Sequence, residues 1–331
     1  IDPLSIDDLT PLLDLLYNPD IVKVFHACSQ DLEIFFYLNG EVPRPVFDTQ
    51  LAAPLLGLPE QMGYGNFVAE MLGVTLDKAQ ARTDWSRRPL ETPQLSYAAD
   101  DVRYLAEIYP KITARLEELG RLDWLNSEFA DYERSERYQN DPADAWKRLR
   151  GLDKLRPRGL AIIQVLAEWR EQMAQQKNLP RNWIIRDDVM IDIARLAPDN
   201  TAKLGRIRNL QGKTLERYGA RLIALVEEAG QRQAKPLPGW KKRSKPTAQE
   251  EALTDILHAQ LRLLADKHRI NSTVLAGRKD LLELARGDAD VAVLHGWRRE
   301  MAGAELLAIC EGQRLVSVDH GQVVVSEKPG A

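Results

Sequence analysis

The chain has little of what stabilises secreted proteins or anchors a chain in a membrane. Its 331 residues include only two cysteines, Cys28 and Cys310, which lie far apart in the sequence. This sparse use of cysteine favours a reducing compartment, and the first residues show no secretion signal. No apolar run approaches the roughly 18 residues that a membrane span needs. We therefore expect a cytoplasmic protein without a membrane-spanning segment.

Two common binding patterns are also absent. The five histidines show no zinc-ligand spacing. Gly212, Lys213 and Thr214 resemble the end of a phosphate loop, but that motif requires a first glycine where this chain has Ile207. No strand is expected before this segment either. We expect neither a zinc site nor ATP dependence.

The net charge of −4 hides a strong asymmetry along the chain. Residues 1–130 carry 10 Lys and Arg against 21 Asp and Glu, residues 141–245 carry 23 against 12, and residues 246–331 carry 10 against 13. An acidic module joined to a basic one suggests that the first holds cations and the second a polyanion. Each charged region alone could equally be a solvated face.

The pattern of apolar residues predicts an α/β module followed by helices. Two short β-branched runs, residues 21–26 and 46–47, read as strands, and residues 31–38 and 93–119 read as helices. At roughly 100–200 residues per domain, the length predicts two or three domains. We expect domains over residues 1–130, 141–234 and 248–326, with polar linkers over residues 129–144 and 235–247.

Strand signals nearly vanish in the second half of the chain. Helical spacing covers residues 161–175, 187–196 and 214–229, and an offset of 91 aligns residues 190–195 with residues 281–286. This indicates two diverged copies of one helical domain, although amphipathic helices can also match by chance. The valine-rich residues 315–325 add at most a short pair of strands.

One predicted helix carries a candidate catalytic pair. Tyr97 and Asp101 lie four residues apart, so their side chains project from one face of the helix. A phenol and a carboxylate so placed can converge on one water and one metal ion, which suits phosphodiester hydrolysis. The alternative is an ordinary amphipathic helix with Leu95, Val102 and Leu105 facing the core and Tyr97 half-buried.

A third candidate is Asp31, which follows the first predicted strand and begins a helix. An acidic residue there can simply cap the helix or interact with its dipole. Strand ends in α/β layers are also where binding sites form. Both interpretations remain open for Asp31 from the residues alone.

Taken together, the chain resembles the DEDD superfamily of 3′-to-5′ exonucleases in its tyrosine-bearing branch, and within it the ribonuclease D family. The exonuclease likeness is carried by residues 25–35, 46–57, 83–90 and 94–105. Residues 151–171 and 179–188 are similar to the helicase-and-RNase-D C-terminal (HRDC) domain. The resemblance extends over nearly the whole chain. It implies a ribonuclease H-like α/β domain followed by two small all-α domains.

The resemblance also implies a chemistry. Asp31, Tyr97 and Asp101 take the places of the family's catalytic residues, with Asp31 and Asp101 binding two Mg²⁺ or Mn²⁺ ions roughly 3.5–4 Å apart. Tyrosine, with a pKa near ~10, is a poor base at neutral pH, so Tyr97 would orient the attacking water or take its proton once the metal has activated it. The implied activity is 3′-to-5′ exoribonuclease trimming of RNA, transfer-RNA precursors included, with release of 5′-monophosphates.

One family motif is missing from the sequence. An Asp-x-Glu pair on an early strand would present both carboxylates on one face, because residues i and i+2 of a strand point the same way. Asp31 and Glu33 have this spacing but lie on a predicted helix, where a two-residue step turns the side chains apart by about 200°. The family pattern places the missing strand before Ile1. We therefore expect an upstream segment in the native protein, and very low activity without it.

The basic middle region supplies the candidate RNA contacts. Arg156, Arg158, Arg181 and Lys213 lie at predicted turns, where long cationic side chains can reach phosphates. We expect RNA affinity to fall steeply with salt. Two other functions stay open: a DNA exonuclease on the same scaffold, and a non-catalytic nucleic-acid-binding scaffold, which the missing motif would favour.

Overall fold

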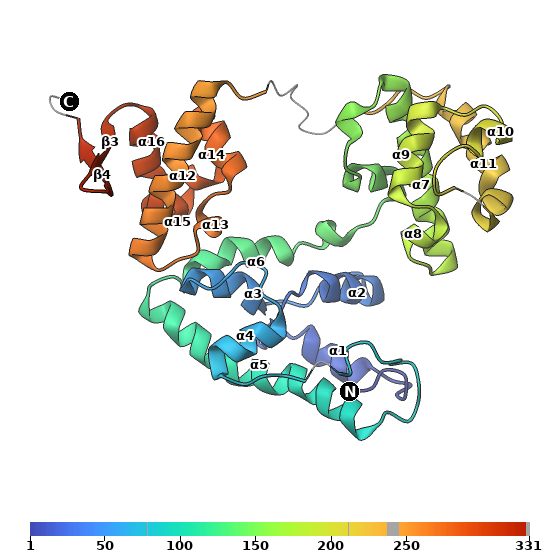
Figure 1. The fold of residues 1–331 in the computed structure, drawn as a ribbon. Helices are drawn as coiled ribbons and strands as arrows, with labels where there is room; N and C mark the ends of the chain where they lie inside the picture. Colours follow the sequence, from blue (N-terminus) through green and yellow to red (C-terminus); the bar gives the residue numbers. More distant parts are fainter. Residues whose placement is uncertain (78, 211, 237–244, 329–331) are drawn as a thin grey trace. The chain divides into compact units, whose positions relative to one another are not determined.

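The computed structural model describes residues 1–77, 79–210, 212–236 and 245–328 (Figure 1). It divides into two compact units, one formed by Ile1–Tyr138 with Pro246–Ala331 and the other by Gln139–Lys245. We call residues 1–138 the N-terminal module, 139–245 the middle module and 246–328 the C-terminal module. The predicted second linker falls largely on residues 237–244, outside the described residues.

The N-terminal module is an α/β layer with a small sheet. Strands β1 and β2 pair in parallel, with Lys23 opposite Val46 and Phe25 opposite Asp48. Its helices and strands are α1 (Thr10–Leu16), β1 (Lys23–Phe25), α2 (Ser29–Asn39), β2 (Val46–Asp48), α3 (Thr49–Ala52), α4 (Tyr64–Leu72), α5 (Thr92–Glu118) and α6 (Asn126–Tyr132). Both predicted strands and the two predicted helices are confirmed.

A capping box fixes the start of helix α5. Glu91 and Gln94 bond each other's backbone N–H groups at its first turn. Its C-terminal half is packed in the core through Ile108, Ile112 and Leu116, which are fully buried. Its N-terminal half instead lies on the surface.

The amphipathic alternative for this helix is wrong at two of its three apolar positions. Leu95 is 54% exposed and Val102 67% exposed, while Leu105 is partly buried. The face that carries Tyr97 and Asp101 is therefore not placed by packing of these neighbours into a core.

Residues 129–144, which were predicted to be a linker, contain the boundary between the two units, at Tyr138 and Gln139, and they also form local structure. Helix α6 runs to Tyr132, and short 3₁₀ turns follow at Ser135–Tyr138 and Pro142–Arg148. The aromatic residues hold this segment in place: Phe129 packs on Phe47 at 5.2 Å, and Tyr138 is 5% exposed. Aromatic residues spaced among the charges thus outweigh the polar composition.

The middle module is all helical and has its own core. Its helices are α7 (Pro157–Lys177), α8 (Arg181–Ile184), α9 (Asp187–Leu196), α10 (Thr201–Leu204) and α11 (Lys213–Ala229). Helix α7 packs against α9 and α11. Two tryptophans lie in the core of the module, Trp146 from the turn before α7 and Trp169 from α7, and they are 1% and 7% exposed. Trp183, on α8, is 72% exposed.

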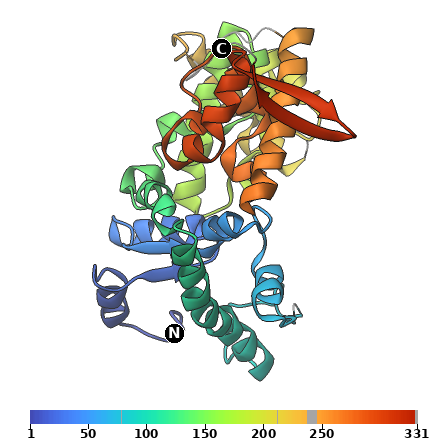
Figure 2. The same cartoon turned by 90° about the vertical axis from the view of Figure 1, so that its left-hand side faces the viewer.

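The C-terminal module repeats this plan at the predicted offset. Its elements are α12 (Ala248–His268), α13 (Ser272–Leu275), α14 (Arg278–Ala285), α15 (Gly296–Arg298), α16 (Ala304–Cys310), β3 (Arg314–Asp319) and β4 (Gln322–Glu327). Adding 91 to the bounds of α7 and α8 gives the bounds of α12 and α13, and α9 and α14 both begin at matching positions. The expected strand pair is the antiparallel β3–β4 hairpin, drawn in red beside α16 (Figure 2).

The N-terminal and C-terminal modules share one hydrophobic core, which extends from Phe47 to Ile309. Trp124 and Trp297 stack in parallel at 4.5 Å, and Glu128 pairs with Arg298 at 2.7 Å. No helix in the described ranges is long and apolar enough to cross a membrane.

Arg121 ties the N-terminal and C-terminal modules together. Its guanidinium is 6% exposed and donates to the carbonyl of Leu55, at 2.6 Å, and to those of His268 and Arg269. These carbonyls lie at the C-terminal ends of two helical segments, one from each module. A single cation therefore satisfies both ends, where the helix dipoles are negative.

Candidate active site

The first turns of α5 carry the candidate pair. Tyr97 and Asp101 lie on one face of the helix, one turn apart. The indole of Trp85 packs against the Tyr97 ring at 5.9 Å. Gln94 donates to the Thr83 hydroxyl at 3.1 Å and so holds the loop that carries Trp85. The phenol is thus fixed from two sides, by its helix and by this loop.

Tyr64, on α4, lies beside the same carboxylate. Its hydroxyl donates to the Asp100 carbonyl at 2.8 Å. Burial, and then the charge of Asp101, raise the pKa of Tyr64 to about 12. The same two causes raise the pKa of Tyr97. Both phenols therefore keep their protons at neutral pH and present hydrogen-bond donors near Asp101.

Asp101 lies in a negatively charged environment. Partial burial, followed by the neighbouring Asp100, raises the pKa of its carboxyl. Asp100 has a cation, Arg103, at 3.2 Å, whereas Asp101 forms no ion pair with the described residues. An unneutralised carboxylate beside a second carboxylate is a place where a bound cation is stabilised.

Asp31 lies in the first turn of α2, directly after the β1–α2 loop. Burial, and then the charge of Asp48, raise the pKa of its carboxyl. Asp48 itself is 1% exposed and accepts hydrogen bonds from the backbone N–H groups of Ala27, at 2.9 Å, and Cys28, at 2.8 Å. Asp48 therefore holds in place the loop that precedes Asp31. Within this loop Ala27 has a φ of 67°.

The structure brings Tyr97, Asp101 and Tyr64 together and places Asp31 beside Asp48. Within the described ranges, no three His, Cys, Asp or Glu side chains are grouped so as to hold a metal ion on their own. The donors that are present still fit a hard divalent cation, since Asp31 and Asp101 are carboxylates that form no ion pair with a cationic side chain of the described residues.

The four candidate RNA contacts differ in their surroundings. Arg156 and Arg158 are exposed at the start of α7, and Lys213 is exposed at the start of α11. Arg181 instead donates two hydrogen bonds to Glu171, one of 2.8 Å, and the Glu171 side chain is only 4% exposed. A guanidinium held by a buried carboxylate has fewer donors to offer to a phosphate.

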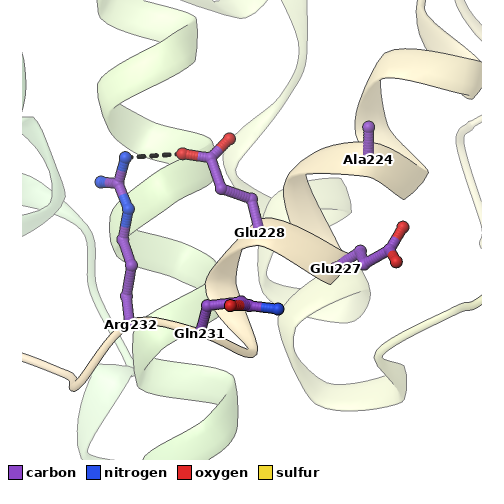
Figure 3. A pocket seen from close by; sticks show the side chains of 5 residues that line it. All are labelled: Ala224, Glu227, Glu228, Gln231 and Arg232. Carbon is purple, nitrogen blue, oxygen red and sulfur yellow. Dashed lines mark hydrogen bonds and ion pairs between the residues drawn. The ribbon is translucent and has the colours of Figure 1, made fainter.

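A shallow pocket at the end of α11 is a poor candidate for this chemistry. Ala224, Glu227, Glu228, Gln231 and Arg232 line it (Figure 3). Arg232 is held by Glu228 at 2.6 Å and by Glu168 at 3.1 Å. Its charges are largely satisfied within the protein.

Comparison with known proteins identifies the family. The 3′-5′ exonuclease family model matches residues 1–117, and the HRDC domain model matches residues 159–226. Ribonuclease D of Sphingobium indicum is 40% identical over 96% of this chain and 82% of its own length. The chain belongs to the ribonuclease D family. Ribonuclease D of Nitrobacter hamburgensis is 38% identical over 97% of this chain and 84% of its own length.

The solved structures agree with this assignment. The crystal structure of Escherichia coli RNase D, described as an exoribonuclease involved in structured RNA processing, superimposes with a TM-score of 0.76 at 32% identity. The match covers 94% of this chain and 85% of that one. As a ribonuclease D, the chain is a 3′-to-5′ exoribonuclease, with an α/β exonuclease domain followed by helical domains.

Sequence reasoning missed three residues that shape the candidate site. Asp48 was not considered, although an aspartate that directly follows a buried strand is a usual helix cap. Trp85 lies within a stretch that resembles the family, but its contact with Tyr97 depends on how the loop folds. Tyr64 carried no signal, because its hydroxyl reaches Asp100 only in the tertiary structure.

Proposed function

We propose that this ribonuclease D removes nucleotides one at a time from RNA 3′ ends and releases 5′-monophosphates, with Asp31, Tyr97 and Asp101 as its catalytic residues. The observation that supports this most is the pairing of a protonated phenol with an unneutralised carboxylate on one face of α5. The described neighbours leave both groups available to a water and a cation.

In this proposal Tyr97 orients the attacking water rather than deprotonating it. A raised pKa keeps its proton in place, so its hydroxyl can donate to the water or to a phosphate oxygen. Its ring is positioned by Trp85, which limits the directions that the hydroxyl can take. The main role of Tyr97 is then geometric.

Asp31 and Asp101 would hold the divalent cations, Mg²⁺ or Mn²⁺, which oxygen ligands favour. Two ions bound there would supply an activated water and stabilise the charge of the leaving oxygen. Asp48 contributes by fixing the loop before Asp31 and is a positioning residue.

The substrates we propose are structured RNAs, transfer-RNA precursors among them. The net positive charge of residues 141–245 suits the phosphates of a folded RNA body, and the acidic N-terminal module suits the metal ions. RNA affinity should therefore fall steeply as salt rises.

The test is 3′-end release of nucleotides from labelled RNA by the native protein with Mg²⁺ or Mn²⁺. Asp101→Asn should lower kcat roughly a thousand-fold, which corresponds to about 4 kcal/mol, and Tyr97→Phe roughly a hundred-fold. Glu107→Gln, on the same helix and in an exposed ion pair with Lys111, is the matched control and should leave kcat unchanged. EDTA should abolish release.

Two results would overturn parts of the proposal. Asp101→Asn with a kcat equal to that of Glu107→Gln would remove Asp101 from the site. DNA of the same sequence degraded as fast as RNA would favour the alternative of a DNA exonuclease on this scaffold.

A further inference from the structure

The middle module contains a cavity of about 510 Å³ whose charged lining is entirely basic among the described residues. Helix α7 and the turn before it form one wall, and the end of α9 forms the other. The lining residues are Lys154, Leu155, Arg156, Arg158, Gly159, Ala194, Arg195, Leu196 and Ala197. Four cationic side chains thus share one opening, and no carboxylate lines it.

The walls of this cavity are fixed by a close contact between two helices. A Cβ atom at position 159 would lie 2.8 Å from the Ala194 carbonyl oxygen, so only glycine allows α7 and α9 to approach this closely. Arg158 precedes this contact on α7, and Arg195 follows it on α9. Arg158 and Arg195 are therefore brought together by the packing of two helices, while Lys154 and Arg156 lie in the turn before α7.

The fold does little to neutralise these charges. The described residues include one ion pair to the four cations, Arg195 with Asp192 at 3.2 Å, and both of its side chains are exposed. Like charges gathered at one opening repel one another, and an anion between them relieves that repulsion. The first backbone N–H groups of α7 also have no side-chain cap, because Arg156 precedes the helix at the capping position.

The corresponding place in the C-terminal module shows that the helical plan does not need these cations. The offset of 91 puts Thr247, Glu250 and Arg286 at the positions of Arg156, Gly159 and Arg195. Thr247 and Glu250 form a capping box, and Glu250 also pairs with Arg286 at 3.2 Å. There the site is closed by the protein's own carboxylate.

We propose that the cavity of the middle module binds backbone phosphates of the RNA substrate, which take the place that Glu250 fills in the C-terminal module. The inference rests on the proposed exoribonuclease function and adds Lys154 and Arg195 to its RNA contacts. Guanidinium groups match phosphate oxygens in a two-point geometry. The volume lies in the range of roughly 300–1,000 Å³ that small-ligand sites occupy, and Leu155 and Leu196 offer apolar surface to an attached sugar.

The first experiment measures binding of single-stranded RNA in EDTA, where no hydrolysis occurs, across a series of salt concentrations. A plot of log affinity against log salt has a negative slope. Arg156→Gln, Arg158→Gln and Arg195→Gln should each make that slope less steep by about 0.7. Arg158→Glu, which supplies a carboxylate as Glu250 does, should weaken binding at least about tenfold at a fixed salt concentration. Thermal unfolding of each variant checks that the module still folds.

Arg221→Gln is the matched control. It removes the same charge from the same module, but Arg221 lies on α11 and outside the cavity lining, beside Glu228 at 3.9 Å. Cavity variants whose affinity and salt slope match those of Arg221→Gln would overturn the inference.

Hydrolysis of a dinucleotide separates this inference from the proposed function. A dinucleotide offers only the phosphodiester that is cleaved, so its turnover reports on Asp31, Tyr97 and Asp101. Arg221→Gln, outside the cavity, should hydrolyse it like the parent protein. A parent that cleaves the dinucleotide while its cavity variants bind RNA normally would refute the cavity alone. A parent that binds RNA through the cavity but cleaves nothing would refute the proposed function alone.

Discussion

The middle and C-terminal modules share one helical plan but differ in charge and attachment. Buried positions correspond across the offset of 91, as Met190 does with Leu281 and Ile193 with Leu284, and all four are at most 2% exposed. Yet residues 141–245 carry a net charge of +11 and residues 246–331 a net charge of −3. The middle module forms its own unit, whereas the C-terminal module shares a core with the N-terminal module.

This difference shows which parts of a repeated fold are free to change. Apolar positions at helical spacing fix the helices, because their burial drives packing. The two copies differ at their polar positions. The middle module has an open basic cavity, whereas the C-terminal module has the Glu250–Arg286 ion pair there and binds Arg121 through backbone carbonyl groups. One plan thus supports an open basic cavity in one copy and a structural contact with the N-terminal module in the other.

Breaking the attachment of the C-terminal module should have the largest effect. Arg121→Met removes a buried cation that satisfies three carbonyl groups at two helix ends, and we expect a loss of about 3–5 kcal/mol in the free energy of unfolding. Urea unfolding measures this loss. Arg115→Met, in an exposed pair with Glu118, should cost less than about 0.5 kcal/mol. Equal losses for the two variants would show that Arg121 does not hold the modules together.

A smaller loss is expected for Arg181→Gln, which breaks an ion pair that the C-terminal module lacks. That module has Arg262 and Ser272 at the positions of Glu171 and Arg181. Without Arg181 a carboxylate that is only 4% exposed loses its partner, and we expect a cost of about 2–3 kcal/mol at pH 7. Urea unfolding at pH 7 gives this value.

The pH dependence of that loss has a definite sign. Although burial acts to raise the pKa of Glu171, the hydrogen bond and charge of Arg181 lower it on balance. The pair therefore stabilises the fold above the unfolded-state pKa of about 4.5, and this contribution is lost as the pH falls through the lower folded-state pKa. The gap between parent and Arg181→Gln should shrink below about pH 4.5. A gap independent of pH would contradict this assignment.

The smallest effect should come from breaking the ion pair between Glu250 and Arg286 in the C-terminal module. Glu250→Gln removes the charge that pairs with Arg286 but can keep the capping box, which accepts glutamine, so we expect a cost of about 0.5–1 kcal/mol. Glu251→Gln, at the next position of α12, is the control. Thermal unfolding compares the two. A loss as large as that of Arg181→Gln would mean that the closed site is a major source of stability.

Much of the fold follows from local sequence patterns. The capped start of α5, the end of α2 at Gly40 and the offset of 91 all depend on residues close in sequence or on repeated apolar spacing. The boundary between the two units lies within the predicted linker over residues 129–144. The helical turns there were not predicted, because the aromatic residues of this segment contact residues, such as Phe47, that are distant in sequence.

The site was predicted less completely, for a related reason. Tyr97 and Asp101 share a helix, so their spacing alone places them together. Asp48, Trp85 and Tyr64 act through contacts that cross between elements, and no periodicity reports such contacts. The pairing of Arg181 with Glu171 belongs to the same class, since it joins two helices across a turn.

The core shared by the N-terminal and C-terminal modules bears on the order of folding during synthesis. The ribosome releases the N-terminal module first, yet part of its core is supplied by residues as late as Leu306 and Ile309. The middle module emerges between them with a complete core of its own. Since domains fold as they emerge, at about 5–20 residues per second, the second unit can finish folding while the first still waits for its last helices. The N-terminal module is thus synthesised before the middle module but completes its folding after it.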